Sequence, residues 1–296
     1  MLRVLIIGCG DMARRALPLL ARRYRMFALV RSLETSLAAE FAALGVTPIR
    51  GDLDQPASLR QLAGLAELVL HFAPPPDRGN RDTRTQHLIA ALQRGKILPR
   101  RLVYISTSGV YGDCGGDWVG ETHCVAPHTA RARRRIDAEQ RLRRWGRGGG
   151  PSVSILRVPG IYAAERLPLE RIRRGDPVLM RDDDVFTNHI HADDLALCIL
   201  AALRRGRPNR VYHASDDSAG LPMAEWYDAI ADTFELPHPP RVSRAEAQAL
   251  LSPLVLSYMS ESRRLDNSRL RRELQVRLAC PNVGVGLAKI AAAGKE

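Results

Sequence analysis

The amino-acid sequence predicts an α/β protein of the Rossmann type, with a doubly wound parallel sheet and a smaller, mostly C-terminal substrate region. The first supporting observation is an apolar, β-branched run at Leu2–Ile7 that ends in glycines and leads directly into a helical pattern. The second is the alternation of short apolar runs with helical segments of ten or more residues, which is typical of parallel crossover units. The third is size, because 296 residues that are 45% hydrophobic can bury a large core beside a smaller one.

The turn after the first strand carries the strongest functional signal. Gly8, Gly10 and Ala13 fit the pattern G-x-G-x-x-G/A, and a helix opens at Asp11-Met12, two further expected cofactor contacts. Such a turn lets backbone N–H groups and the positive end of the helix approach a pyrophosphate. The pattern therefore predicts a dinucleotide site, and the alternative is an ordinary tight turn.

The second predicted strand, Met26–Val30, ends at Arg31. In dinucleotide-binding folds an acidic residue about 20 positions after the glycines holds the ribose hydroxyls, whereas an arginine there accommodates a 2′-phosphate. Arg31 therefore favours NADP(H), with NAD(H) as the alternative, unless it is simply one more surface arginine.

The remaining elements follow in the same alternation. Periodicity and turn residues predict helices and strands in this order: helix Ser32–Leu44, strand Val46–Arg50, strand Leu68–Phe72, helix Thr83–Arg94, strand Arg101–Ser106, helix Ala130–Arg147, strand Val153–Val158, helix Asp193–Leu203 and strand Val211–Ala214. Two amphipathic helices, Met223–Phe234 and Arg244–Leu251, are expected to cover the substrate.

The net charge of +12 raises the question of nucleic-acid binding. Only three of the 44 basic residues are lysines, and the arginines are spread over the whole chain, as a coding bias would produce. With 5% aromatic residues and no interleaving of aromatic and basic residues, the pattern argues against a nucleic-acid partner and remains compatible with anionic small-molecule substrates.

Several other classes are disfavoured. No apolar run approaches the roughly 18 residues that span a bilayer, and the N-terminus is used by the first strand, so we expect a cytoplasmic protein without a membrane partner. The five cysteines are odd in number and form no C-x-x-C pair, so free thiols are expected. His123, Cys124 and His128 match no usual zinc spacing, and no metal site is expected.

Six motifs in a fixed order carry a resemblance that covers most of the chain. They are GCGDMA at 8–13, GDL at 51–53, HFAPP at 71–75, STSGVYG at 106–112, LRVPGIY at 156–162 and NHIHADDLA at 188–196. The chain resembles an extended short-chain dehydrogenase/reductase of the NAD-dependent epimerase/dehydratase type. The resemblance implies a nucleotide-binding domain at 1–165, completed by about 188–215, and a substrate region at 166–187 and 216–296.

The resemblance also implies further cofactor-binding positions. Asp52 and Leu53 are expected near the adenine end of the dinucleotide, whereas Phe72, Ala73 and Pro74 are expected along its path. Pro159 is a further expected cofactor contact. Thr107 falls at the position where members of the family place a serine or threonine that faces the nicotinamide.

The family's proton relay, a Tyr-x-x-x-Lys pair, is missing. If Glu139 is aligned with the glutamate that usually follows the pair, its two positions fall on Arg131 and Arg135. No alignment restores the pair, because the chain has no tyrosine between 111 and 162 and no lysine between 96 and 289. Arginine stays protonated and cannot carry the proton, but these two could grip a ribose, a phosphate or a substrate carboxylate.

Other side chains are candidates for the proton carrier. Tyr111 is closest in sequence to Thr107, although the tyrosine of this motif is commonly structural in the family. His71, Tyr162 and His191 are the further candidates, and the resemblance places His191 in a structural turn.

Three functions follow from this sequence. The chain is expected to be an NAD(P)-dependent oxidoreductase or an epimerase/dehydratase-like enzyme that acts on a carbonyl or sugar-nucleotide substrate. The second alternative is a catalytically silent NADP(H)-binding sensor or scaffold. The third is a polyanion-binding protein that uses the arginine-rich helix Ala130–Arg147. Asp137 and Glu139 interrupt that helix and favour instead a solvated face or the contact of a homodimer.

Overall fold

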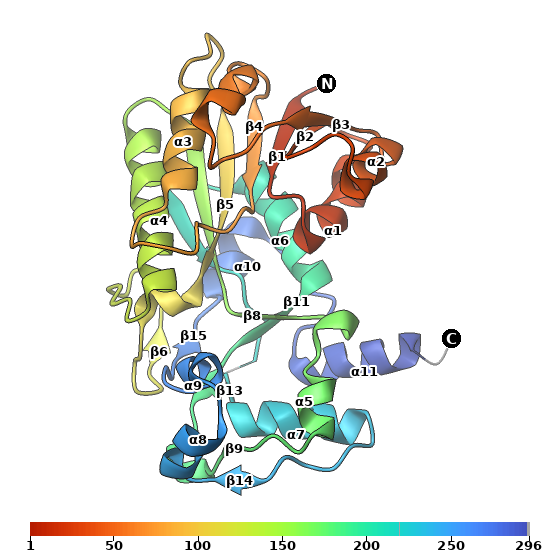
Figure 1. Ribbon diagram of the computed structural model, residues 1–296, viewed down its shortest axis with the longest axis vertical. Helices are drawn as coiled ribbons and strands as arrows, with labels where there is room; N and C mark the ends of the chain where they lie inside the picture. Colours follow the sequence, from red (N-terminus) through yellow and green to blue (C-terminus); the bar gives the residue numbers. More distant parts are fainter. Residues whose placement is uncertain (219, 295–296) are drawn as a thin grey trace.

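The computed structural model describes residues 1–218 and 220–294, and its centre is a seven-stranded parallel sheet. The strands lie in the order β12-β7-β5-β4-β1-β2-β3. Their bounds are β1 Arg3–Ile7, β2 Arg25–Val30, β3 Val46–Arg50, β4 Leu68–His71, β5 Arg101–Thr107, β7 Ser152–Val158 and β12 Arg210–His213. Figure 1 shows this sheet in the upper part of the molecule. The Rossmann-type fold expected from the sequence is confirmed.

Helices cover both faces of the sheet because its strands carry apolar residues on both sides. In β1, Val4 and Ile6 pack into one buried cluster, and Leu5 and Ile7 pack into the other. The first cluster lies under α1 Asp11–Leu20, α2 Ser36–Ala43, α6 Ala192–Arg205 and α10 Ser268–Leu274. The second lies under η1 Pro56–Leu62, α3 Thr83–Leu92 and α4 Ala130–Arg147. The molecule is therefore doubly wound.

A smaller region with its own core lies below the sheet in Figure 1. Trp226, Ile230 and Leu287 lie in that core. Its elements are α5 Leu169–Arg173, β9 Val178–Leu179, η4 Arg181–Asp183, β10 Phe186–Thr187, β13 Leu221–Pro222, α7 Met223–Thr233, β14 Arg241–Val242, α8 Arg244–Leu250, α9 Pro253–Tyr258 and α11 Val283–Ala293. β14 pairs with β9 in parallel, and β10 pairs with β13 antiparallel.

Short elements join the two regions. They are η2 Ser108–Tyr111, β6 Trp118–Val119, β8 Gly160–Tyr162, η3 Ala164–Arg166, β11 His189–His191 and β15 Arg264–Leu265. β11 pairs with β8, and β15 pairs with β6, so segments from both halves of the sequence meet at the lower edge of the sheet.

The C-terminal part differs from the division expected from the sequence. Helix α10 falls within the range assigned to the substrate region, yet its Leu270 and Leu274 are buried in the cluster that also contains α6. Arg205 of α6 donates a hydrogen bond from Nε to the carbonyl oxygen of Leu274 at 2.7 Å. The sequence did not predict helix α11, and residues 219, 295 and 296 of the expected substrate region lie outside the described residues. Within the described chain, no helix is both long and apolar enough to cross a membrane.

Candidate functional site

The larger cavity, about 640 Å³, lies at the carboxyl ends of the central strands. This is the edge at which open α/β sheets bind their ligands. Ten of the twelve positions that the sequence marks for the cofactor line this cavity: Gly8, Gly10, Asp11, Met12, Arg31, Asp52, Leu53, Phe72, Ala73 and Pro74. The other two are placed elsewhere. Ala13 is fully buried where α1 packs on the sheet, and Pro159 lines a second cavity.

The glycine turn has two glycines with different requirements. Gly8 has a φ of +94°, and a Cβ added to it would lie 2.4 Å from the backbone nitrogen of Ala73. Gly10 precedes α1, and a Cβ there would meet no protein atom within 4 Å. Gly8 is therefore required by the fold, whereas the protein itself does not require a glycine at position 10. The open space at Gly10 and the unpaired N–H groups at the start of α1 fit a pyrophosphate.

Charged side chains surround the end of β2. Arg31 is exposed, lines the larger cavity, and makes no ion pair with any residue of 1–218 or 220–294. Nearby, Arg84 binds Asp54 at 2.6 Å, and this hydrogen bond, together with the positive charges of Arg84 and Arg31, lowers the pKa of the Asp54 carboxyl. The guanidinium of Arg31 is thus available to an anionic group in this part of the cavity.

Asp11, at the start of α1, is used differently. Its carboxylate forms ion pairs with Arg15 and Arg166, each at 2.9 Å. These bonds tie the first turn of α1 to η3. The Asp11 carboxylate therefore supports the cavity wall, while the backbone of Asp11 lies at the N-terminus of α1.

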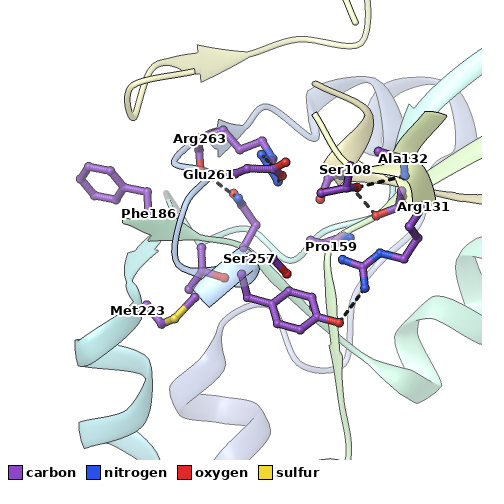
Figure 2. A pocket seen from close by; sticks show the side chains of 16 residues that line it. Ser108, Arg131, Ala132, Pro159, Phe186, Met223, Ser257, Glu261 and Arg263 are labelled. Carbon is purple, nitrogen blue, oxygen red and sulfur yellow. Dashed lines mark hydrogen bonds and ion pairs between the residues drawn. The ribbon is translucent and has the colours of Figure 1, made fainter. Parts of the chain in front are cut away.

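The smaller cavity, about 330 Å³, lies between the sheet and the smaller region. Figure 2 shows Ser108, Arg131 and Ala132 on one side of it and Phe186 and Met223 on the other. Its remaining lining includes Thr107, Asn188, Tyr258, Glu261 and Arg263.

The two cavities are neighbours because they share two chain segments. Ile105 of β5 lines the larger cavity and Thr107, two residues later, lines the smaller one. In β8, Gly160 lines the smaller cavity and the next residue, Ile161, lines the larger one. The two cavities therefore adjoin at the ends of β5 and β8.

Thr107 is held at the end of β5 by its own side chain. Its Oγ1 accepts a hydrogen bond from the backbone N–H of Gly109 at 3.2 Å, which leaves its hydroxyl proton free to be donated. A Cβ built on Gly109 would lie 3.5 Å from Oγ1 of Thr107 and 3.8 Å from Oε2 of Glu261. The hydroxyl and the carboxylate thus both lie close to the position that a side chain at residue 109 would occupy.

Helix α4 contributes one lining arginine to each cavity. The helix begins after Thr129, whose side chain accepts a hydrogen bond from the N–H of Ala132 at 3.1 Å. Arg135 lines the larger cavity and donates to the carbonyl oxygen of Ile105 at 2.7 Å. Arg131, one turn earlier, lines the smaller cavity and donates to the phenol oxygen of Tyr258 at 2.7 Å. The two arginines lie where the sequence expected them, on one face of the helix, but they serve different cavities.

The candidate Tyr111 is a structural residue and lines neither cavity. It is 1% exposed and its hydroxyl lies 2.6 Å from Nε2 of His213. Nδ1 of His213 must donate to the carbonyl of Asp266, so Nε2 accepts the proton of Tyr111. Arg157 donates to the same hydroxyl at 2.7 Å, and burial raises the pKa of Tyr111 to about 12. With both its bonds satisfied inside the protein, Tyr111 cannot reach a substrate in either cavity.

The other three candidates are also buried outside both cavities. His71 is fully buried, its Nε2 bonds Thr85, and burial lowers its pKa to about 3. Tyr162 packs against Trp226 in the core of the smaller region, and burial raises its pKa. His191 accepts the N–H of Asp193 and so caps α6, in the structural role that the resemblance implied.

Arg157 also forms the most buried ion pair of the described chain. It binds Glu139 of α4 at 2.7 Å, and each side chain is 4% exposed. Ser106 of β5 donates to the same carboxylate at 2.5 Å. Glu139 therefore fixes α4 against β5 and β7, and so fixes the positions of Arg131 and Arg135.

Sequence reasoning missed three residues of the smaller cavity. Tyr258, Glu261 and Arg263 all belong to the C-terminal part of the chain, and none of them was assigned to the site from the sequence. Arg263 is buried, donates to the carbonyl of Gly112, and pairs with Glu261 at 2.8 Å. No local spacing in the sequence relates these residues to Thr107 or Arg131, so only their long-range contacts could reveal them.

Comparisons with known proteins agree with this architecture. The family model described as "NAD dependent epimerase/dehydratase family" matches residues 13–215. Among solved structures, a functionally unknown conserved protein from Silicibacter pomeroyi DSS is similar over 100% of both chains, with 28% identity and a TM-score of 0.79.

Two enzymes of known activity share the fold. A UDP-N-acetylglucosamine 4-epimerase from Bacillus cereus is similar over 100% of both chains at 15% identity, with a TM-score of 0.73. A dTDP-glucose 4,6-dehydratase from Streptomyces venezuelae, determined with NAD bound, is similar over 100% of this chain and 97% of that chain at 21% identity, with a TM-score of 0.76. No curated protein matches the chain. Because the family model spans more than half of the sequence, the chain belongs to the NAD-dependent epimerase/dehydratase family.

Proposed function

We propose that the chain binds NADP(H) in the larger cavity and oxidises, reduces or epimerises a carbonyl or sugar-nucleotide substrate in the smaller one. The observation that carries this proposal is the glycine turn. Gly10 opens onto the larger cavity with no protein atom near its missing side chain, and the start of α1 supplies free N–H groups there. A bound nicotinamide cofactor supplies the hydride acceptor or donor for this chemistry.

The choice of NADP(H) over NAD(H) depends on Arg31. The residue lines the cavity after β2, is exposed, and is bound to no carboxylate in the described chain. An unpaired guanidinium in this position suits a 2′-phosphate. The NAD in the dehydratase structure is a property of that protein. The preference of this chain for NADP(H) over NAD(H) is therefore to be measured.

The smaller cavity favours an anionic substrate. Two arginines, Arg131 and Arg263, and one carboxylate, Glu261, line it, so its formal charge is positive. Positive charge in a cleft draws in anions and raises the rate of their association. Phosphates of a sugar nucleotide or a carboxylate of a smaller carbonyl compound would both meet this requirement.

Calorimetric titration with NADPH and NADH tests the cofactor assignment first. Turnover is then followed by the absorbance of the reduced cofactor with UDP-glucose, UDP-glucuronic acid, dTDP-glucose and a set of small aldehydes, ketones and keto acids. We expect NADPH to bind more tightly than NADH and at least one anionic compound to be turned over. If neither cofactor binds, the proposal is wrong.

A catalytically silent NADP(H)-binding protein is the second candidate, and one observation favours it. If Glu139 is aligned with the family's glutamate, the Tyr-x-x-x-Lys positions fall on Arg131 and Arg135, neither of which can carry a proton. Tight NADPH binding with no turnover of any compound in the set would support this alternative.

A further inference from the structure

The seven tyrosines of the chain differ sharply in their surroundings. Six line neither cavity: Tyr24 packs against the sheet core, and the others are buried, namely Tyr104, Tyr111, Tyr162, Tyr212 and Tyr227. Tyr258, at the end of α9, lines the smaller cavity together with Thr107 and is 49% exposed. Its phenol is therefore the one that a substrate beside Thr107 can reach.

Arg131 contacts both the ring and the hydroxyl of Tyr258. Its Nη1 donates to the phenol oxygen at 2.7 Å, and its guanidinium carbon lies 4.9 Å from the centre of the ring. Figure 2 shows this bond as the dashed line from Arg131. Because the phenol oxygen accepts the arginine's hydrogen, the phenol proton remains free for another acceptor. A phenolate formed by losing that proton would be stabilised by the adjacent positive charge.

Other proton-carrying groups in the smaller cavity are fewer than the sequence suggested. In the described chain, none of the eight histidines lines the larger or the smaller cavity. Oε2 of Glu261 accepts hydrogen bonds from both terminal nitrogens of Arg263, at 3.1 and 2.8 Å. Apart from Glu261 and the two arginines, Tyr258 is the titratable side chain that lines this cavity, and no described residue accepts its phenol proton.

We propose that Tyr258 is the proton carrier of this enzyme and that Arg131 is its positioning residue. In reduction, the carbonyl carbon would gain a hydride from a bound reduced nicotinamide, which would be oxidised. The carbonyl oxygen takes the proton of Tyr258, so that an alcohol forms and the O–H bond of the phenol breaks. Arg131 stabilises the phenolate, which regains a proton from water. Oxidation of an alcohol runs the same steps backwards. The inference rests on the proposed function, because it needs a nicotinamide beside Thr107.

The primary test compares Tyr258→Phe with Tyr24→Phe. The first keeps the ring on Arg131 and removes only the hydroxyl, and the second makes the same chemical change outside both cavities. Using the best compound from the set above, we expect kcat to fall 10²- to 10⁴-fold in Tyr258→Phe and to stay unchanged in Tyr24→Phe. NADPH affinity, measured by calorimetry, and the melting temperature should stay unchanged in both variants.

A second pair of variants tests Arg131 separately from simple binding. Arg131→Met removes the positive charge beside the phenol, whereas Arg131→Lys retains it. We expect kcat to fall in Arg131→Met and to be partly restored in Arg131→Lys. A change in KM alone, equal in both variants, would show that Arg131 only binds substrate and would overturn its role toward Tyr258.

The outcomes separate this inference from the proposed function. Absence of NADPH binding by the wild-type protein would refute the proposed function, and the inference with it. NADPH binding with full turnover in Tyr258→Phe would refute the inference alone. A loss of kcat in Glu261→Gln without one in Tyr258→Phe would make the carboxylate the proton carrier.

A crystal structure with NADP⁺ decides the question if no compound is turned over. The inference requires that one carbonyl group can lie about 3–3.5 Å from the nicotinamide carbon that exchanges hydride and about 2.6–3.2 Å from the phenol oxygen of Tyr258. A phenol directed away from the nicotinamide would overturn it.

Discussion

The two glycines of the first turn provide a sharp experiment, because alanine should affect them in opposite ways. At Gly8 the φ of +94° is a strained conformation for alanine, at a cost of roughly 1–3 kcal/mol. The added Cβ would also lie 2.4 Å from a backbone atom of Ala73, and such overpacking costs roughly 1–3 kcal/mol more. At about 2 °C per kcal/mol for a chain of this size, Gly8→Ala should lower the melting temperature by roughly 4–12 °C.

Gly10→Ala should leave the fold almost unchanged. Its φ of −85° is allowed for alanine, and its Cβ would meet no protein atom within 4 Å, so we expect a loss of stability below about 1 kcal/mol. The methyl group would, however, stand where backbone approaches the pyrophosphate, and we expect the Kd for NADPH to rise at least about tenfold, or about 1.4 kcal/mol. Differential scanning calorimetry and NADPH titration measure the two effects. Unchanged NADPH affinity in Gly10→Ala would refute the placement of the cofactor.

Substitutions at four further positions test the site and the core. Arg31→Asp should shift the preference from NADPH toward NADH, and an unchanged ratio of the two Kd values would remove Arg31 from the cofactor site. Thr107→Ala should abolish most turnover while Thr107→Ser retains it; equal kcat values in steady-state assays would show that the hydroxyl is not used. Tyr111→Phe should cost about 1–3 kcal/mol in urea unfolding, because it leaves buried partners unpaired, but should not change kcat; a large loss of kcat at unchanged stability would contradict the structural role. Burial raises the pKa of Asp216 from 3.8 to about 7, so the folded chain binds more protons than the unfolded chain between these values. The free energy of unfolding should therefore fall as the pH rises from about 4 to 7, and Asp216→Asn should flatten this dependence; the same pH slope in both proteins would disprove it.

Much of the fold followed from local patterns. The strand that ends at Ile7, the glycine turn and the helix from Asp11 were predicted together, because β-branched runs, glycine conformations and helix periodicity are properties of neighbouring residues. The same reasoning found all seven strands of the sheet and most of its helices. It did not place α10, because nothing local shows that Leu270 and Leu274 pack on α6 rather than in the smaller region.

Many residues that line the larger cavity could also be identified from the sequence. Gly10, Arg31, Asp52 and Ala73 lie at the ends of successive parallel strands or in the turns after them, and such ends meet at one edge of a sheet. The burial of individual side chains could not be predicted from the sequence. Tyr111 is near Thr107 in the chain but points into a network with Arg157 and His213, and only the packed structure shows it.

The sequence alone determined the Rossmann architecture, the glycine turn, and the absence of the Tyr-x-x-x-Lys pair, since all three can be identified from residues close together in the chain. Only the tertiary structure decided which side chains share the smaller cavity. Arg131 and Tyr258 are 127 residues apart, on helices from different regions, and their contact depends on how those regions pack. Packing of this kind leaves no period or spacing in the sequence, because it is set by the shapes and contacts of whole elements rather than by the residues next to each side chain.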